Sequence, residues 1–280
     1  MRPIDTCSCK EGGSLKLLYH TVAGRCILKI LTRPAVSVIG GAFLKTPISR
    51  IWIKKYIDKN KIDMSRFKKT IYQSFNDFFT RELKGTKDFK KYPKNLLLAP
   101  CDGKVSAYII SKENTFYIKN SLYTIKDLIE DEALAEDFIG GTCVIFRLTP
   151  DDYHRYHYID DGRILAQKKI LGILHTVRPI AHSKYPVYIR NSRVCTRMHT
   201  VNFGEVIQIE VGALMVGKIQ NHKSSGTFSR GEEKGYFEFG GSTIILILKK
   251  DSVEMNRELI ENTIRGEESI LRMGHVIGEK

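Results

Sequence analysis

The feature that most constrains the fold of this chain is a change in the spacing of its apolar residues at about residue 96. Before this point they recur every three or four residues, which places them on one face of a helix. After it, short apolar runs are separated by Gly and by Asn-Ser pairs, a pattern typical of strands and turns. The sequence therefore predicts an α+β protein, in which a helical N-terminal segment precedes a β-rich, mostly antiparallel body.

The helical segment is expected to have three parts. A helix over 15–33 ends at Pro34, an apolar run follows over 35–44, and a strongly basic stretch over 46–70 also has helical character. A helix needs about 20 apolar residues to cross a bilayer. The run over 35–44 is too short for that, so it is expected to lie in a membrane interface or to pack on the body.

The body is expected to cover 71–280, after a helical, basic, membrane-associating segment over 1–70. Within the body, the apolar pattern predicts helices over 124–136 and 254–270. The strands that the pattern predicts most clearly are 144–148, 187–189, 206–211 and 243–248.

Positive charge is concentrated in the N-terminal segment. Residues 1–70 contain 15 lysines or arginines and 4 acidic residues, so they carry +11 of the chain's net charge of +14. Such a segment binds anionic lipid, binds nucleic acid, or forms a solvated surface without a partner. Charge alone leaves these three interpretations open.

Several common classes of site and protein are disfavoured by the motifs that are missing. The six cysteines include no Cys-x-x-Cys pair, so free thiols in a reducing compartment are expected, and the first residues do not resemble a signal peptide. The chain has no GxSxG motif, P-loop or dinucleotide fingerprint. A hydrolase of the α/β type and a nucleotide-binding enzyme are therefore disfavoured.

A polar segment over 151–157 follows the predicted strand 144–148 and contains His154 and His157. Loops at strand ends often carry catalytic groups. Zinc would need further ligands besides these two histidines, whereas acid–base chemistry needs only a histidine that titrates near neutral pH. Surface histidines without a role are the third interpretation.

Asp102 lies in a Pro-Cys-Asp-Gly sequence that favours a tight turn. Its carboxylate either stabilises that turn or orients a histidine.

The sequence Gly240-Gly241-Ser242-Thr243 directly precedes the predicted strand 243–248. One interpretation is an ordinary glycine turn. The other is self-cleavage, because a serine hydroxyl can attack the carbonyl of the preceding residue if a histidine takes its proton. Glycine at 241 leaves that carbonyl open to attack. Elimination of the resulting ester and loss of ammonia would leave a pyruvoyl group in place of Ser242.

Together these motifs resemble the phosphatidylserine decarboxylase family, from about Ile62 to Leu248. The segments that carry the resemblance are Ser74–Arg81, Pro100–Gly103, Arg147–His157, His175–Val177, Val211–Gly217 and Gly240–Thr243. Family members often have Leu-Gly-Ser-Thr at the cut, and here Gly240 replaces the leucine.

The resemblance implies a role for each matching residue. Ser242 is the self-cleavage nucleophile and becomes the pyruvoyl cofactor, which forms a Schiff base with the substrate amine. His157 is its base, Asp102 is the partner of His157, and His154 binds or protonates the substrate. Cleavage between Gly241 and Ser242 yields chains 1–241 and 242–280, and neither a metal nor pyridoxal phosphate is needed. Arg147, Arg155 and Arg178 are candidate phosphate contacts.

The expected reaction is the decarboxylation of phosphatidylserine to phosphatidylethanolamine and CO2, in phospholipid biosynthesis. A basic N-terminal segment suits an anionic membrane, since each Lys or Arg near such a surface adds about 1 kcal/mol. We therefore expect a peripheral protein at the cytoplasmic face of the cell membrane, with no nucleic-acid partner and with a homodimer as a possible assembly.

The sequence leaves three alternative functions open. They are a pyruvoyl decarboxylase for a soluble amino acid, a non-catalytic binding protein of the same fold, and a biotinyl-type carrier hairpin at 211–217.

Overall fold

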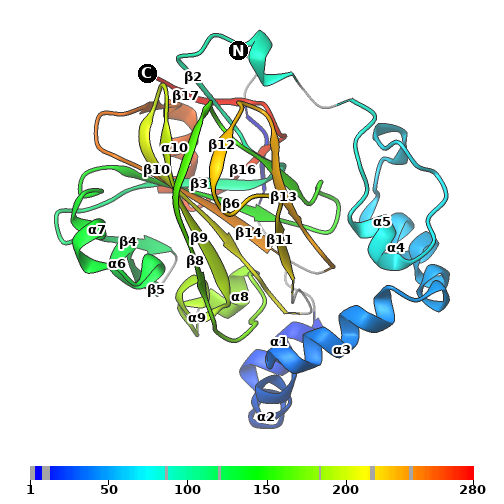
Figure 1. The fold of residues 1–280 in the computed structure, drawn as a ribbon. Helices are drawn as coiled ribbons and strands as arrows, with labels where there is room; N and C mark the ends of the chain where they lie inside the picture. The colour runs from blue at the N-terminus through cyan, green and yellow to red at the C-terminus, as the bar shows by residue number, and fades with distance from the viewer. Residues whose placement is uncertain are drawn as a thin grey trace.

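The computed structural model describes residues 4–7, 13–85, 88–118, 121–182, 184–214, 218–239 and 242–280. It confirms the predicted α+β class, with helices at the N-terminus and a body built on antiparallel sheets (Figure 1). The predicted boundary at residue 70 stays a prediction.

The N-terminal helices are shorter than predicted. They are α1 (Gly13–His20), α2 (Val22–Leu31), α3 (Pro34–Leu44), the 3-10 helix η1 (Pro47–Trp52), α4 (Ile53–Asn60) and the 3-10 helix η2 (Met64–Arg66). The single helix predicted over 15–33 was wrong, because the Thr21 hydroxyl accepts a hydrogen bond from Gly24 N (2.9 Å) and starts a new helix. The helix predicted over 46–70 ends at Asn60, since Lys61 has a left-handed backbone with φ of 51°.

The body is organised around a nine-stranded antiparallel sheet in the order β1-β16-β3-β6-β14-β10-β9-β8-β12. Its strands are β1 (Thr6–Cys7), β3 (Gly103–Ile109), β6 (Thr142–Leu148), β8 (Gly162–Ile170), β9 (Arg193–Thr200), β10 (Gly204–Val211), β12 (Gly226–Phe228), β14 (Ser242–Leu248) and β16 (Glu268–Leu271). The predicted strands 144–148, 206–211 and 243–248 are confirmed as β6, β10 and β14.

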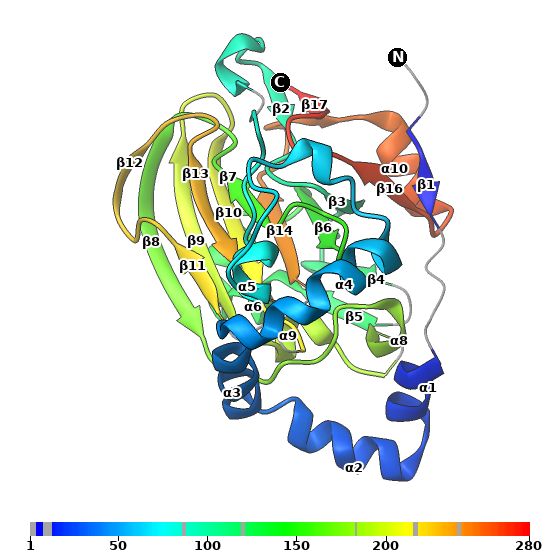
Figure 2. The same cartoon turned by 90° about the vertical axis from the view of Figure 1, so that its right-hand side faces the viewer.

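Smaller elements surround this sheet (Figures 1 and 2). The small sheets are formed by β7 (Arg155–His157), β11 (Ile219–Asn221) and β13 (Glu233–Phe237), by β2 (Leu96–Leu98), β15 (Glu254–Met255) and β17 (Val276–Glu279), and by β4 (Thr115–Ile118) with β5 (Ser121–Thr124). The helices are α5 (Phe75–Phe79), η3 (Phe89–Lys91), α6 (Ile125–Ile129), α7 (Glu132–Glu136), α8 (Pro179–His182), α9 (Val187–Arg190) and α10 (Arg257–Ile264).

Three local predictions in the body need correction. The stretch 187–189, predicted as a strand, lies in α9; three apolar residues are too few for their spacing to separate a strand from a helical turn. The helix predicted over 124–136 is interrupted at Glu130, which has a φ of 51° and ends α6. The helix predicted over 254–270 is only α10, and strands β15 and β16 occupy its two ends.

The main core lies at the centre of the large sheet. All seven residues of both β6 and β14 are buried. One face of the sheet is covered in part by the small sheet of β7, β11 and β13, where Lys234 Nζ of β13 lies 2.8 Å from Glu210 Oε1 of β10. Burial on both faces explains why 243–248 reads as a continuous apolar run rather than an alternating one.

The N-terminal helices are joined to the body at specific polar contacts. The buried Tyr19 hydroxyl of α1 forms a hydrogen bond with His175 Nδ1 (3.1 Å) and accepts one from Thr176 N (3.3 Å). Leu174 N donates to Thr32 O, at the end of α2 (2.9 Å). No single helix in the described ranges is long and apolar enough to cross a membrane, and α2 with α3 pass that test only as a pair bent by 68°.

Candidate active site

Ser242 begins the central strand β14 and lies opposite Leu148 of β6. Its side chain is fully buried, and its Oγ has no hydrogen-bond partner in the part of the chain that the structure describes. A buried hydroxyl without a partner costs free energy and is rare in folded proteins. Gly241, the other residue of the predicted cut, lies outside the described residues.

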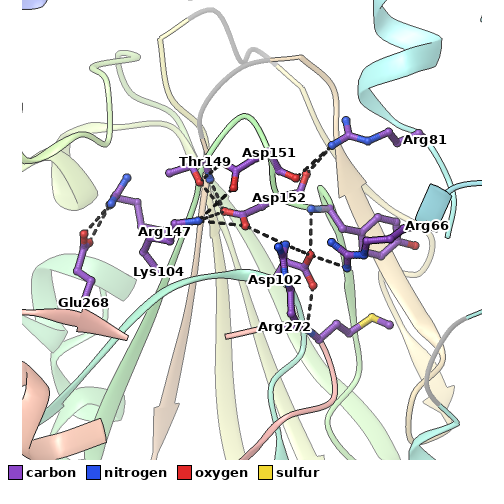
Figure 3. Close-up of polar contacts among 12 residues, drawn as sticks. Arg66, Arg81, Asp102, Lys104, Arg147, Thr149, Asp151, Asp152, Glu268 and Arg272 are labelled. Atoms are coloured by element: carbon purple, nitrogen blue, oxygen red, sulfur yellow. Dashed lines mark hydrogen bonds and ion pairs between the residues drawn. The ribbon is translucent and has the colours of Figure 1, made fainter. Parts of the chain in front are cut away.

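The turn after Leu148 is a polar loop held by its own side chains (Figure 3). The Asp152 carboxylate accepts hydrogen bonds from Thr149 N (2.7 Å) and Thr149 Oγ1 (2.8 Å). The buried Arg81 guanidinium donates to Asp152 O (3.0 Å), and its burial lowers the arginine pKa to about 10. The loop therefore leads the chain from the strand opposite Ser242 to the two histidines along a defined path.

His154 lies beside the segment that leads into the predicted cut. Phe237 N, at the end of β13, donates to His154 O (3.0 Å), and Ser242 follows five residues later. The imidazole packs against Phe79 with a centroid distance of 4.0 Å and a tilt of 40° between the rings, and neither ring nitrogen has a hydrogen-bond partner among the described residues. Burial lowers the pKa of His154 to about 3, so the ring is neutral at neutral pH.

His157 ends β7 and pairs with Glu233 of β13. Its ring lies 6.2 Å from the rings of Phe89 and Tyr153, and Nδ1 has no hydrogen-bond partner in the described ranges. Burial lowers the pKa of His157, with a smaller opposing effect of the Glu233 charge. A neutral imidazole can accept a proton, as a general base must.

Asp102 is fully buried, but its hydrogen bonds go to groups other than His157. Met273 N donates to Oδ1 (2.9 Å), and Arg272 Nη1 and Arg66 Nη2 lie 3.0 and 3.2 Å from Oδ2 (Figure 3). Among the described residues, no hydrogen bond joins Asp102 to His157, although the Asp102 charge raises the His157 pKa slightly. The predicted role of Asp102 as the partner of His157 stays a prediction.

A charged cluster extends from Asp102 to the Thr149–Asp152 loop. Lys104 Nζ lies 3.3 Å from Asp152 Oδ1 and 3.5 Å from Asp151 Oδ2, while Arg272 also approaches Asp152 at 3.6 Å. Burial raises the pKa of Asp152. Sequence analysis missed Lys104 and Arg272. Lys104 is two residues after Asp102 and could have been noticed, whereas Arg272 has no local signal.

Two of the three arginines predicted as phosphate contacts already bind carboxylates. Arg147 forms a two-point ion pair with Glu268 at 2.8 and 2.6 Å. Arg155 lies 2.8 Å from Glu233 and donates to Thr80 O at 2.7 Å. Arg178 forms no ion pair with any other residue that the structure describes. In the described ranges, no three His, Cys, Asp or Glu side chains gather into a group that could hold a metal ion.

The arrangement fits a cofactor made from the chain itself. Among the described residues, Ser242, His154 and His157 all carry buried polar atoms without hydrogen-bond partners. Ser242 pairs with Leu148 at the end of β6, and the chain continues from there to His154 and His157 of the neighbouring small sheet. A nucleophilic hydroxyl must keep its lone pairs free for attack, and a base must be neutral. Ser242 Oγ has no hydrogen-bond partner in the described ranges, and burial lowers the pKa of both histidines, so that they are neutral at neutral pH.

Comparison with known proteins gives the same family as the sequence motifs. The family model described as phosphatidylserine decarboxylase matches residues 75–279. A phosphatidylserine decarboxylase proenzyme 2 of Clostridium acetobutylicum is 47% identical over 96% of this chain and 92% of its own length. Proenzymes of the same name from Clostridium perfringens and Fusobacterium nucleatum are 40% and 39% identical, over 94% and 96% of this chain and 91% of each relative. The chain therefore belongs to the phosphatidylserine decarboxylase family.

Proposed function

We propose that this chain is a self-processing phosphatidylserine decarboxylase that cuts itself between Gly241 and Ser242 and converts Ser242 into a pyruvoyl group. The relatives are named as proenzymes of that activity. The observation that carries the proposal is the buried Ser242 Oγ at the start of a central strand, which has no hydrogen-bond partner among the described residues. The observation suits a nucleophile better than a structural serine.

In the proposed processing, Ser242 Oγ attacks the Gly241 carbonyl carbon, and the peptide C–N bond breaks to give an ester. His157, neutral because it is buried, takes the hydroxyl proton. Elimination then breaks the ester C–O bond, which leaves Gly241 with a carboxylate and residue 242 as dehydroalanine. Rearrangement and addition of one water release one ammonia and leave the pyruvoyl group.

In the proposed reaction, the pyruvoyl carbonyl supplies the electron sink that loss of CO2 from the serine head group requires. The chain's own groups position the substrate. His154 is proposed to bind the reacting substrate, since neither of its ring nitrogens is engaged elsewhere among the described residues. The Phe79 ring fixes the imidazole plane. The products are phosphatidylethanolamine and CO2, and the pathway is phospholipid biosynthesis.

The proposed location is the cytoplasmic face of the cell membrane, with the helices α1 to α4 in contact with lipid. Exposed apolar side chains are concentrated on the N-terminal helices, namely Leu17, Val22, Ile27, Ile30, Val38, Ile39, Phe43, Ile48, Ile51 and Trp52. These helices lie together at one side of the body (Figures 1 and 2). Apolar faces flanked by basic residues are typical of helices that lie in the membrane interface.

Intact mass tests the processing. Denatured wild-type protein should split into chains 1–241 and 242–280, with the small chain lighter by one ammonia than a peptide that begins with serine. The Ser242→Ala variant should stay whole. A single uncut wild-type chain would contradict self-processing and favour a binding protein of the same fold.

Product analysis then separates the two kinds of substrate. The cut protein should release CO2 from phosphatidylserine in detergent micelles and leave free L-serine unchanged. Turnover of free serine at a similar rate would instead support the alternative of a soluble amino-acid decarboxylase.

Flotation with vesicles that contain phosphatidylglycerol tests the membrane contact. Val38 and Ile39 are 66% and 72% exposed, so the double variant Val38→Asp/Ile39→Asp should fold normally and lose flotation. The control is Leu171→Asp/Val201→Asp, which changes similarly exposed residues of the body. Equal flotation of both variants would overturn the placement of the membrane contact on α3.

A further inference from the structure

A pocket of about 450 Å³ lies between α3 and the part of the body that leads into the cut. We call it the α3 pocket. The lining residues that matter here are Val38, Gly41 and Lys45 from α3, and Lys218, Glu238 and Phe239 from the body. The pocket is therefore shared by a helix with an exposed apolar face and by the chain just before Ser242.

The wall of the α3 pocket is continuous with the candidate active site. Phe239 is three residues before Ser242. Its ring packs edge-on against Phe79 at a centroid distance of 5.2 Å, and Phe79 in turn packs on His154 at 4.0 Å. Phe239 N also donates to Asn76 Oδ1 (3.3 Å), which fixes this wall to α5. A molecule in the pocket that contacts Phe239 would thus be separated from His154 by the rings of Phe239 and Phe79.

Two lysines in the α3 pocket share one carboxylate. Lys45 Nζ lies 2.9 Å from Glu238 Oε2, and Lys218 Nζ lies 3.9 Å from Glu238 Oε1. Glu238 is only 14% exposed, whereas the lysines are 47% and 58% exposed. The lining residues carry two positive charges and one negative charge, so the pocket keeps an excess of +1. This excess favours an anion that bears a single negative charge.

The α3 side of the pocket is open at Gly41. A Cβ atom added to Gly41 would meet no other atom within 4 Å. Glycine in a helix costs up to about 1 kcal/mol relative to alanine, so its presence at an open position needs a reason other than crowding. Val38, one turn earlier, is 66% exposed. The pocket thus has charged groups on the body side and an apolar edge on the helix that we place at the membrane.

We propose that the α3 pocket binds the glycerol and phosphodiester of the phospholipid substrate, with Lys45 and Lys218 contacting the phosphate. This inference rests on the proposed function. A phosphodiester carries one negative charge, which matches the excess charge of the pocket. The acyl chains would leave along the apolar edge at Val38, and the serine head group would point past Phe239 toward His154. The pocket would then select a phospholipid over free serine, which lacks the phosphate.

Binding to uncut protein tests the pocket independently of catalysis. The probe is dihexanoyl phosphatidylserine below its micelle concentration, titrated into the Ser242→Ala protein. Lys45→Ala and Lys218→Ala should each weaken binding about tenfold, as expected for loss of a hydrogen bond to a charged group. Lys169→Ala, which removes an exposed lysine of β8, should leave the affinity within twofold. Unchanged affinity in both pocket variants would overturn the proposal.

Filling the pocket provides a second test. Gly41→Leu should fold well, because leucine favours helix more than glycine does and the position is open. It should weaken binding of the same lipid by about tenfold or more, while Gly41→Ala should have a smaller effect. Equal affinities for Gly41→Leu and the parent protein would show that the lipid binds elsewhere.

Competition distinguishes a lipid site from a general anion site. Glycerophosphoserine should displace the lipid probe, and inorganic phosphate at the same concentration should not. Equal displacement by inorganic phosphate would overturn the assignment to a phosphodiester.

In cut enzyme, the same lysine variants should raise KM for phosphatidylserine with kcat nearly unchanged, and intact mass should show normal processing. An uncut wild-type chain would contradict the proposed function. The binding measurements on uncut protein would still test whether the α3 pocket binds the phospholipid.

Discussion

His154 and Ser242 show at the residue scale why this site is recognisable. Both side chains are buried, and among the described residues His154 keeps both ring nitrogens and Ser242 its hydroxyl without a hydrogen-bond partner. Such atoms cost stability, so their position beside the predicted cut is best explained by chemistry. Burial also keeps His154 neutral at neutral pH, with a pKa of about 3.

The His154 pKa predicts a dependence of stability on pH. As the pH falls from 6.5 toward 3, the unfolded chain binds a proton at this histidine and the native state does not. Stability is therefore lost across this window, by about 1.4 kcal/mol per pH unit. In the uncut Ser242→Ala background, His154→Gln should reduce the pH slope of the unfolding free energy by that amount between pH 5.5 and 4.5. Urea titrations measure it, and equal slopes would contradict the prediction.

Asp102 should contribute strongly to stability, whatever its part in processing. Its carboxylate binds Arg272, Arg66 and Met273 N from a fully buried position. Asp102→Asn removes the charge, and we expect a loss of about 2–3 kcal/mol, because hydrogen bonds to charged groups contribute about that much. Urea unfolding of the uncut protein measures it. The control is Asp63→Asn, which changes an exposed carboxylate of the same region. An equal and small effect of both changes would contradict the stabilising role of Asp102.

The pairing of β7 with β13 is the element-scale feature that assembles the site. β7 ends at His157, β13 leads toward Ser242, and the antiparallel register places His154 beside Phe237. Neither strand was predicted from the sequence, since each is short and the first is rich in polar residues. The N-terminal helices are the second element-scale feature, and their attachment depends on few contacts.

Tyr19 is expected to be the main polar anchor of α1. Its buried hydroxyl binds His175 Nδ1 and Thr176 N, so Tyr19→Phe leaves two buried groups without a partner. We expect the attachment of α1 to the body to lose about 1–3 kcal/mol of stability. The loss should be observed mainly as faster amide hydrogen exchange in α1 and α2. Tyr117→Phe, at an exposed tyrosine, should leave exchange unchanged. Protection of α1 equal to that of the parent protein would show that apolar packing alone anchors the helix.

At the scale of the whole molecule, the proposed cut falls beside the central strand of the main sheet. β14 lies between β6 and β10, and the C-terminal part of the chain also supplies β16 to the same sheet. All seven residues of β14 are buried. The proposed small chain 242–280 would thus be a structural part of the core rather than a detachable peptide.

The two chains should therefore stay together after cleavage. Native size-exclusion chromatography should elute both in one peak, and they should separate only in denaturant. Release of the small chain under native conditions would mean that processing disrupts the sheet. The uncut Ser242→Ala protein supplies the reference elution volume.

The sequence by itself determined the features that depend on local pattern. The apolar run 243–248 was sufficient to predict a central strand, because a strand covered on both faces must be apolar throughout. The order of short motifs around His154, His157 and Ser242 was sufficient to indicate the family. The helical character of the N-terminus followed from spacing, although its division at Thr21 depended on one side chain accepting a hydrogen bond.

Only the tertiary structure decided which groups meet. Arg272 binds Asp102 across 170 positions of the chain, and Tyr19 binds His175 across 156. Local spacing contains no information about such pairs, because the partner of a buried charge or hydroxyl is set by how distant segments pack. The same holds for the α3 pocket, whose lysines Lys45 and Lys218 are far apart in the sequence and meet at Glu238. The spacing of apolar residues in the sequence therefore predicts helices and strands, whereas the packing of distant segments determines which side chains form a site.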